Sequence, residues 1–333
     1  MVRNMVSIKD VADRAGVAIS TVSKVLNDYP NVSAKTKSKV HAAINELGYV
    51  PNMAAAMLSS KQSSRIALLI NPNTETQALD EIDMQYILGA TRCAKEHKLD
   101  IITIFFSMMK DMSVEEITKY LKSQNISGLI VCGMDQNCKK IQKLVNDRHF
   151  KFVLIDTPIY NETTSSVWID NEKAQYDVAK QTVIGNDCHS ILYIAGKEES
   201  YVTKNRINGI KRFAKDYNMT LKVVNGNFSE LKAREITFAY GKNFDLIACG
   251  SDLMAIGAMK ALTEMDIFHP VCGFDGITLM GYVGMQMNTV KQNFSNISSK
   301  AVEELIKLMS GETGRNIILE HELVRMKYED IIR

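Results

Sequence analysis

From residue 65 onward, short apolar runs alternate with longer amphipathic segments, and this alternation constrains the fold more than any other feature of the chain. The apolar runs are Ile66–Ile70, Ile101–Phe105, Gly128–Val131, Phe152–Ile155, Ile191–Ile194, Leu221–Val224, Leu246–Cys249 and Val271–Phe274. The amphipathic segments of helical length are Met84–Lys98, Val114–Gln124, Lys173–Ile184, Val202–Tyr217 and Leu253–Glu264. Continuous apolar runs are typical of strands buried on both faces of a parallel sheet. The pattern therefore predicts doubly wound parallel α/β structure, and the number of units favours two lobes over one sheet.

The first residues of the chain follow a helical pattern instead. Ser7 and Asp10 have the spacing of a capping pair at the start of a helix over Ile8–Ala15. Gly16 permits the sharp turn that follows. A second helix is predicted over Ile19–Asn27, so the two short helices form a helix-turn-helix pattern.

A third helix completes this small region. Ser33 is placed to cap it, and Gly48 is placed to end it. We therefore predict a helix-turn-helix domain at residues 1–48, a linker at residues 49–62 and a large α/β domain at residues 63–333.

The N-terminal region is basic and the remainder is not. Residues 1–61 hold eight Lys and Arg against four Asp and Glu, a net charge of +4, so the total of +2 leaves −2 for residues 62–333. A basic module on a nearly neutral body predicts a polyanionic partner for the module alone. A solvated helical face would explain the same charge pattern.

The outward face of the second helix carries Ile19, Ser20, Ser23, Lys24 and Asn27. Each of these side chains is either short, or long and basic. Such side chains suit a helix in the major groove of DNA, where Lys can donate to guanine and Ser can reach base edges or phosphates. A solvent-facing helix with no partner is the alternative that this pattern leaves open.

Several function classes lack the motifs they require. The six cysteines are far apart without a Cys-x-x-Cys pair, and the six histidines show no metal-ligand spacing, so no metal or cofactor is predicted. There is no Gly-x-Gly-x-x-Gly after the first strand, no Gly-x-x-x-x-Gly-Lys-Ser/Thr and no Gly-x-Ser-x-Gly, so an enzyme is not expected. No signal peptide and no apolar run of membrane-spanning length is found, which predicts a cytoplasmic protein without membrane association.

Polar residues follow the predicted strands at their carboxyl ends, where doubly wound sheets bind ligands. These residues are Asn71, Asn73, Asp156, Arg206, Ser251, Asp252 and Asp275, with Phe106, Tyr160, Trp168 and Phe228 as aromatic neighbours. Such donors and acceptors would suit a polyhydroxylated ligand with an aromatic ring against its face.

The segments SIKDVADRAGVAISTVSKVLN and VSAKTKSKVHAAINELGYVPN closely resemble the DNA-binding head of the LacI/GalR family of bacterial transcription repressors. The resemblance implies that Ile19, Ser20 and Lys24 read bases. It also implies a set of residues along the phosphate backbone: Ser7, Thr21, Ser23, Asn27, Val32, Ser33, Thr36 and Tyr49. One position departs from the family, because Ala18 replaces the Ser that usually caps the recognition helix; either Ser20 caps a shortened helix or the helix is stabilised only on DNA.

The linker at residues 49–62 contains the helix-prone segment Met53–Leu58, preceded by Asn52 as a possible cap. So short a helix needs support from outside itself. The resemblance implies a hinge helix in the DNA minor groove, with Leu58 as a wedge between bases and Ala55 allowing close approach. The usual Arg after that Ala is Ala56 here, which removes one backbone contact. A merely flexible linker is the alternative.

The large domain resembles the family's effector domain, which is related to periplasmic sugar-binding proteins of type I. The matching segments are VWIDNEKAQYDVAK, ILYIAGKEESYVTKNRINGIKRF, FDLIACGSDLMAIGAMKAL, VCGFDG and TVKQNFSNISSKAVEELIKLM. The implied effector-binding residues are Asn71, Asp156, Arg206, Phe228, Ser251, Asp275 and Gln292, the last at a crossover between lobes. Ser251 and Gly276 replace the family's usual Asn and second Asp, so the effector's identity does not carry over.

The resemblance also implies where the chain passes between the lobes. The passages are expected near residues 157–161, 285–289 and 315–319. Lobe one would then hold residues 65–158 and 290–316, and lobe two residues 159–289 and 317–333.

Together these features predict a homodimeric repressor of a carbohydrate-utilisation operon that binds a pseudo-palindromic double-stranded operator under control of a sugar effector. Two alternatives remain at this point: a regulator whose co-signal is a partner protein, as in catabolite control, and a sugar-binding protein without a role on DNA.

Overall fold

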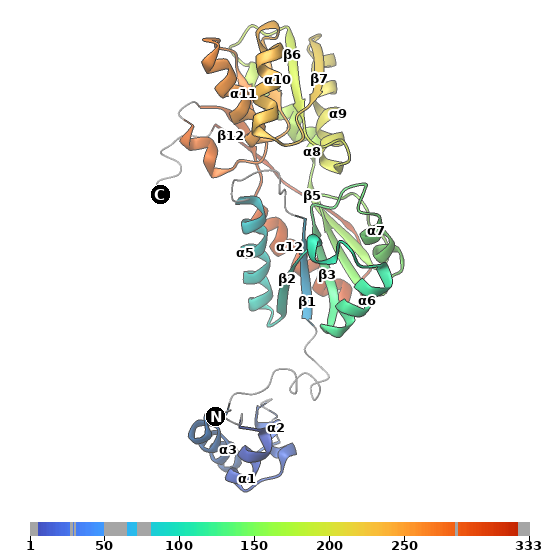
Figure 1. Ribbon diagram of the computed structural model, residues 1–333, viewed down its shortest axis with the longest axis vertical. Coiled ribbons are helices and arrows are strands. Elements are labelled where there is room, and N and C mark those ends of the chain that lie inside the picture. Colours follow the sequence, from blue (N-terminus) through green and yellow to red (C-terminus); the bar gives the residue numbers. More distant parts are fainter. Residues whose placement is uncertain are drawn as a thin grey trace. The chain divides into compact units, whose positions relative to one another are not determined.

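The computed structural model describes residues 6–26, 29, 31–49, 65–71, 81–283 and 286–325. The chain divides into two compact units, Met1–Ser63 and Ser64–Arg333. Figure 1 shows the smaller unit as a group of helices and the larger one as two layered α/β lobes. The predicted hinge helix lies outside the described residues, apart from Tyr49.

The smaller unit contains three helices: α1 (Ile8–Ala15), α2 (Ile19–Leu26) and α3 (Ala34–Leu47). They close around a small apolar core made of Val11, Ala12, Val22, Val25, Val40, Ala43 and Tyr49. Gly16 and Gly48 end α1 and α3 in the left-handed conformation, with φ values of 65° and 61°. The prediction of a three-helix domain is confirmed, and the capping residues expected for α1 and α3 are the observed ones.

Ala18 does not shorten the second helix. The carbonyl of Ala18 accepts hydrogen bonds from the N–H groups of Thr21 and Val22 at 2.8 Å and 3.2 Å, so α2 begins at Ile19. The first of the two expectations for this position, that Ser20 would take over as the cap, is therefore wrong. A methyl side chain cannot accept a hydrogen bond, so Ala18 offers only its backbone to the helix start.

The larger unit contains two six-stranded sheets among the described residues. The first has the order β11-β5-β4-β3-β1-β2 and the second the order β12-β10-β9-β8-β6-β7. The strands are β1 (Arg65–Ile70), β2 (Asp100–Phe105), β3 (Ile126–Cys132), β4 (Lys151–Ile155), β5 (Thr164–Ile169), β6 (Ser190–Ala195), β7 (Thr220–Asn225), β8 (Leu246–Cys249), β9 (Val271–Cys272), β10 (Asn288–Lys291), β11 (Asn316–Leu319) and β12 (Glu322–Arg325). Among the described residues, the pairings between these strands are all parallel except that of β10 with β12.

Helices cover both faces of each sheet. They are α5 (Glu81–Glu96), α6 (Val114–Ser123), α7 (Lys139–Asn146), α8 (Asn171–Val183), α9 (Tyr201–Asp216), α10 (Glu230–Tyr240), α11 (Asp252–Glu264) and α12 (Phe294–Met309), with the short 3-10 helices η1 (Phe106–Met109), η2 (Gly241–Asn243) and η3 (Thr278–Tyr282). The predicted two-lobed, doubly wound parallel architecture is confirmed.

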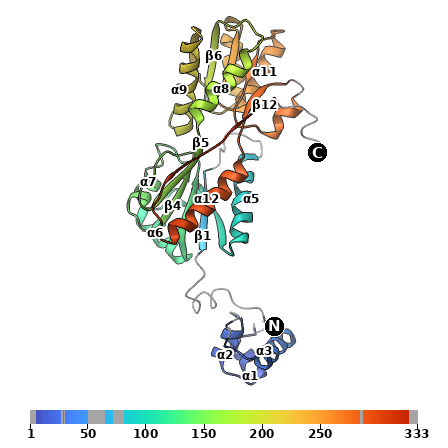
Figure 2. The same ribbon diagram turned by 180° about the vertical axis from the view of Figure 1, so that it is seen from behind.

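Alternate residues of one strand face opposite helical layers. In β1, Ile66, Leu68 and Ile70 pack with α5 and α12, while Ala67 and Leu69 pack with α6 and α7. In the second sheet β6 divides its residues in the same way between the α8–α9 layer and the α10–α11 layer. Figure 2 shows α5 and α12 on one face of the first sheet. This burial on both sides is why these strands appear in the sequence as uninterrupted apolar runs.

The passages between the lobes lie later in the chain than the sequence predicts. β5 pairs with β4 in the first sheet, so the first passage follows Ile169 instead of lying at residues 157–161. β10 belongs to the second sheet, which moves the second passage to Gln292 and Asn293. β11 belongs to the first sheet, which moves the third to residues 320–321.

The first displacement has a clear physical cause. Thr164, Ser165 and Ser166 begin β5 with hydroxyl groups, so the strand does not appear as an apolar run although it is buried. Two of these hydroxyls have internal partners: Ser166 Oγ donates to the carbonyl of Thr157 at 2.6 Å, and Ser165 Oγ accepts from the N–H of Arg315 at 3.2 Å. Buried hydroxyls with such partners are tolerated in a core strand.

Within the described ranges, no group of His, Cys, Asp and Glu side chains has the geometry of a metal site. In the same ranges, no helix is long and apolar enough to cross a membrane.

Candidate functional site

The smaller unit presents an exposed polar face on α2. Ser20 and Lys24 are exposed, Thr21 and Ser23 are half-buried, and Ile19 exposes 47% of its surface. The opposite face of the helix buries Val22 and Val25 completely or nearly so. The side chains expected to read bases are therefore all accessible on one helix face.

Three of the predicted phosphate-contacting residues also take part in capping the starts of helices α1 and α3. The Ser7 hydroxyl accepts from the N–H of Asp10 at 3.3 Å, and the Asp10 carboxylate accepts from the Ser7 N–H at 2.8 Å. This backbone hydrogen bond, more than any other contact, lowers the pKa of Asp10. Ser33 caps α3 and shares a 2.9 Å hydrogen bond with the Thr36 hydroxyl. These three side chains remain exposed or half-exposed, so capping leaves them at the surface.

The other predicted DNA residues differ in accessibility. Tyr49 is only 9% exposed and packs in the small core, and Val32 is half-buried. Four of the predicted residues lie outside the described ranges, namely Asn27, Asn52, Ala55 and Leu58.

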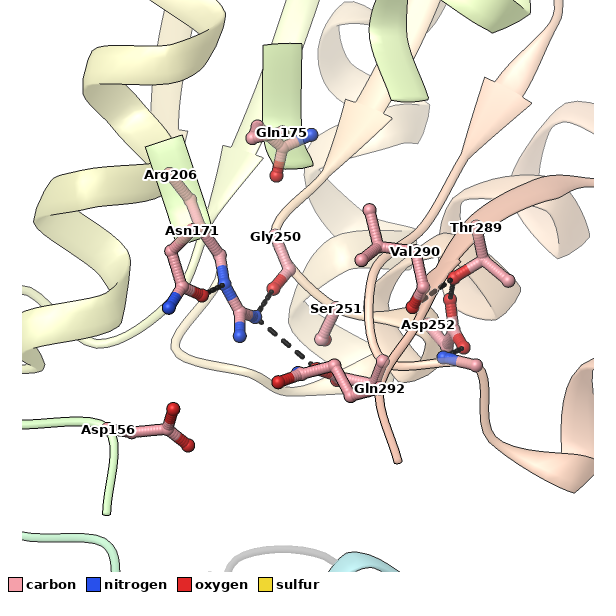
Figure 3. A network of polar contacts seen from close by, with 12 residues as sticks. Asp156, Asn171, Gln175, Arg206, Gly250, Ser251, Asp252, Thr289, Val290 and Gln292 are labelled. Carbon is pink, nitrogen blue, oxygen red and sulfur yellow. Dashed lines mark hydrogen bonds and ion pairs between the residues drawn. The ribbon is translucent and has the colours of Figure 1, made fainter. Parts of the chain in front are cut away.

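The larger unit gathers charged groups where the carboxyl ends of its two sheets face each other (Figure 3). We refer to Asp156, Asn171, Arg206, Asp275 and Gln292 as the interlobe site. Asp156 follows β4 in the first lobe, Arg206 lies on α9, and Asp275 lies beyond β9 in the second lobe. Asn171 and Gln292 lie at the first and second passages between the lobes, the latter as the resemblance implied.

Arg206 is the centre of this site and is only 4% exposed. Its Nε donates to Asn171 Oδ1 at 2.9 Å, and its Nη1 donates to the Gly250 carbonyl at 2.6 Å. Nη1 also lies 3.4 Å from Asp275 Oδ1. The guanidinium carbon lies 3.6 Å from the ring centroid of Phe274. A planar cation held on three sides in this way has a fixed orientation.

Asp275 is held against this cation by its neighbours. Gln292 Nε2 donates to Asp275 Oδ1 at 3.0 Å, and the Asp275 backbone is kept at φ 121° by hydrogen bonds to Val290 and Gln292. Burial raises the pKa of Asp275 to about 8 despite the nearby charge of Arg206. A strained, buried carboxylate of this kind is a frequent feature of binding sites.

Asp156 is the contribution of the first lobe. It is held at φ 58°, and its Oδ2 accepts a hydrogen bond from the phenol of Tyr86 on α5 at 3.1 Å. Burial raises the pKa of Asp156, while the charge of Arg206 and the Tyr86 hydrogen bond oppose that rise. Within the described ranges, no donor reaches its Oδ1.

Two residues predicted to bind the effector have structural roles instead of open polar groups. Ser251 Oγ accepts from the N–H of Met254 at 3.3 Å and so caps α11. Its neighbour Asp252 accepts from Thr289 Oγ1 and from the N–H groups of Gly276 and Ile277. Burial raises the pKa of Asp252 to about 6, and these three hydrogen bonds oppose the rise.

The departure at Gly276 is explained by the backbone. Gly276 has φ 74°, and a Cβ atom there would lie 2.7 Å from Lys291 Cα on β10. Any side chain would therefore push β10 away from Asp275.

The remaining predicted residues lie at the margins. Phe228 covers Gly196, where a Cβ atom would lie 2.1 Å from the ring, and Asn71 is exposed and donates to the Gly133 carbonyl at 3.2 Å. Trp168 donates to Asn316 at 2.6 Å and thereby links β5 to β11, while Tyr160 is 56% exposed. A separate cavity of about 850 Å³ lies at the amino ends of β9 and β10, and no predicted effector residue lines it.

Sequence reasoning did not identify Asn171 and Tyr86 as site residues. Asn171 was missed because β5, which places it, was not recognised as a strand. Tyr86 was missed because it lies within α5, where an apolar ring at helical spacing is indistinguishable from a core residue.

Comparison with known proteins agrees with this arrangement over nearly the whole chain. Residues 7–52 match the model of "Bacterial regulatory proteins, lacI family", and residues 82–313 match that of "Periplasmic binding proteins and sugar binding domain of LacI family". The HTH-type transcriptional regulator RegA of Clostridium saccharobutylicum is 30% identical, over 96% of this chain and 97% of the relative. Catabolite control protein A of Priestia megaterium is 27% identical, over 95% and 96%. The lac repressor dimer bound to operator and the anti-inducer ONPF has the same fold, with a TM-score of 0.82, 24% identity and coverage of 98% and 99%.

Proposed function

This chain belongs to the LacI family of bacterial regulatory proteins and is a DNA-binding transcriptional regulator, and we propose that it represses a carbohydrate-utilisation operon under control of a sugar effector. The expectation that it is not an enzyme agrees with its relatives, which are transcriptional regulators. The observation that carries the proposal is the interlobe site, where a fixed arginine and two buried carboxylates from different lobes converge.

The exposed face of α2 supports a base-reading role for Ile19, Ser20 and Lys24. Lys24 would donate to a guanine edge, and Ile19 would contact a thymine methyl group. Ser7, Thr21, Ser23, Asn27, Val32, Ser33, Thr36, Tyr49 and Asn52 would then orient the head on the phosphate backbone, and Ala55 and Leu58 would enter the minor groove.

Pairing of two chains would place two heads on a pseudo-palindromic operator. Exposed apolar side chains on α5 and α10 support a homodimer: Met84 exposes 51% of its surface, Leu88 60% and Leu231 62%. Exposed apolar surface of this extent favours association.

The effector would act by shifting the population of lobe arrangements. Among the described residues, hydrogen bonds also join the lobes outside the interlobe site. Glu81 on α5 accepts from the N–H and the hydroxyl of Thr278 at 2.8 Å and 2.7 Å, and the N–H of Gln136 donates to the Glu199 carbonyl at 3.1 Å. A ligand that binds Asp156 and Arg206 together would favour the arrangement in which these contacts form. Operator and effector affinities would then be linked reciprocally.

The test begins with the operator. Full-length protein would be used to select binding sites from a randomised duplex pool, and affinity for the selected site would be measured by fluorescence anisotropy at fixed salt. We expect a two-fold symmetric site, and we expect one member of a panel of sugars to change the affinity at least tenfold. Failure to enrich any duplex over a scrambled control would refute the proposal.

One observation favours a second candidate, in which the co-signal is a partner protein. Catabolite control protein A is among the relatives over nearly the full chain. If no sugar changes operator affinity but a protein fraction from the host cell does so at a fixed operator concentration, this second candidate replaces the sugar effector.

A further inference from the structure

Tyr86 connects the core of the first lobe to the interlobe site. Its ring is 4% exposed and packs edge-on against Phe294 at the start of α12, with ring centroids 5.4 Å apart and an interplanar angle of 82°. Its hydroxyl donates to Asp156 Oδ2 at 3.1 Å. Because both contacts are buried, the phenol has a single orientation, and so does the carboxylate oxygen that it binds.

The second carboxylate oxygen of Asp156 is left as an acceptor. The backbone of Asp156 is in the left-handed conformation at φ 58°, and Figure 3 shows its carboxylate apart from the other residues of the site. Within the described ranges, Oδ1 is buried and has no hydrogen-bond donor, and the same holds for Gln292 Oε1 on the other lobe. Buried acceptors without donors are costly, so they indicate groups that a ligand satisfies.

Among the described residues, the site has two carboxyl groups and a single cation. Asp156 and Asp275 face one cation, Arg206, whose Nε and Nη1 are already engaged by Asn171, Gly250 and Asp275. A ligand that brought a phosphate or carboxylate into this site would place its charge beside the Asp156 carboxylate and the buried Asp275 side chain, with one guanidinium to offset it. A ligand with hydroxyl or ammonium donors would satisfy the two acceptors without adding negative charge.

We propose that Tyr86 is a positioning residue that fixes Asp156 as an acceptor, and that this pair restricts the effector to uncharged or amine-bearing polyols, excluding sugar phosphates and sugar acids. This inference rests on the proposed function, because it concerns the ligand of the same site. It adds the selection rule and the residue that sets it.

The first experiment compares ligands that differ only in charge. Isothermal titration and thermal shift of the full-length protein would use glucose, galactose, cellobiose and maltose, the amine glucosamine, the acid gluconate, and glucose and galactose 6-phosphates. We expect every ligand that binds to come from the uncharged or amine-bearing members. Binding of a 6-phosphate or of gluconate more tightly than the matching neutral sugar would overturn the proposal.

The second experiment removes the Tyr86 hydroxyl. Tyr86→Phe keeps the ring packed on Phe294, so we expect the protein to fold and to bind the best ligand of the panel about tenfold more weakly. The matched control is Tyr176→Phe, because Tyr176 donates to Asp216 at 3.1 Å and packs edge-on against Phe213 at 5.6 Å on an exposed part of the second lobe. An equal loss of affinity in both variants would show a general stability effect and would contradict the proposal.

A pH profile separates positioning from packing. Ligand affinity should fall as the pH drops through the pKa of Asp156, because the protonated carboxyl accepts more weakly. The hydrogen bond from Tyr86 lowers the pKa of Asp156. Removing that hydrogen bond should therefore move the midpoint of the affinity profile to higher pH. The titratable and charged groups that face Asp156 are Tyr86 on α5, Cys132 on β3, Arg206 on α9 and Asp275 beyond β9. An unmoved midpoint would contradict the assignment of Tyr86.

If no sugar of the panel binds, a stability measurement without ligand tests whether Asp156 is an unsatisfied acceptor. Asp156→Asn removes a buried charge that lacks a donor at Oδ1, so it should raise the midpoint of thermal unfolding at pH 7.5 and have a smaller effect at pH 4.5. A lower midpoint at pH 7.5 would show that Asp156 is a satisfied structural carboxylate and would overturn the inference. Operator binding without sugar, measured in parallel, tests the proposed function separately.

Discussion

Carboxylates in the two units of this molecule lie in opposite surroundings. In the smaller unit, Asp10 is exposed and accepts from a backbone N–H group at the start of α1, which lowers its pKa. In the interlobe site, Asp275 is buried and Asp156 is half-buried, and the loss of solvent raises the pKa values of both. The smaller unit uses its polar groups to close helix ends and leaves its reading face open. The larger unit leaves buried polar groups incompletely satisfied.

Under the proposed function, this difference follows from what each unit would recognise. DNA offers a ready-made, hydrated surface, so a reading head needs accessible donors on a rigid helix and little else. A small ligand that must move two lobes has to supply free energy at the place where they meet. Groups that are strained or unsatisfied without it make that free energy available.

The sharpest test of this comparison is Arg206→Ala. The change removes the fixed cation from Asn171, Gly250 and Asp275 and leaves Asp275 buried without its counter-charge. We expect the effector response to fall at least a hundredfold, while operator affinity in the absence of effector stays within about twofold. Anisotropy titrations with and without the active sugar would measure both. A variant that still responds at the wild-type sugar concentration would refute the central role of Arg206.

Lys24→Ala is the corresponding test in the smaller unit. Loss of one base contact should weaken operator binding by about 1–3 kcal/mol and relax specificity at one base pair, with sugar affinity unchanged. Lys39→Ala, on the exposed side of α3, is the matched control for loss of a positive charge. Equal weakening on every sequence by both variants would show that Lys24 acts only on phosphates.

The pH dependence of stability should have opposite signs in the two units. Asp275 has a folded pKa above its unfolded value of 3.8, so its ionisation opposes folding and the stability of the larger unit should fall as pH rises toward 8. One proton limits this slope to about 1.4 kcal/mol per pH unit. The depressed pKa of Asp10 has the opposite effect, because that contribution to α1 is present above pH 3.8 and is lost on acidification.

Hydrogen exchange of the full-length protein between pH 4 and pH 8 would separate these two effects by peptide, with Asp275→Asn as the variant that flattens the response of the larger unit. Rates would first be corrected for the intrinsic pH dependence of exchange. Protection of the β9–β10 region that increases with pH would contradict the raised pKa of Asp275.

The smallest expected effect concerns Ala18. Ala18→Ser supplies a side-chain acceptor at the start of α2 and should stabilise the smaller unit by about 0.5–1 kcal/mol. Ala42→Ser, at an exposed position in the middle of α3, should instead be slightly destabilising. Exchange protection of α2 in the full-length protein would measure the difference. Equal effects of the two substitutions would show that α2 needs no side-chain cap.

The sequence by itself determined the elements whose signals are local. α1 and α3 begin and end at the predicted residues, because capping groups and left-handed glycines act within a few positions of the helix end. β8 has the predicted bounds, because all four of its residues are apolar and buried, so the strand appears in the sequence as an apolar run.

Only the tertiary structure decided how these elements combine. Thr164–Ile169 is a core strand, and its Ser165 and Ser166 hydroxyls find partners at Arg315 and Thr157, which are 150 and nine positions away in the chain, so no local pattern identifies it. The same holds for the hydrogen bond between Tyr86 and Asp156, which joins residues 70 positions apart. Local chemistry specifies where helices and strands form. Which buried polar groups meet, and which are left for a ligand, depends on the packing of two lobes that the chain enters several times.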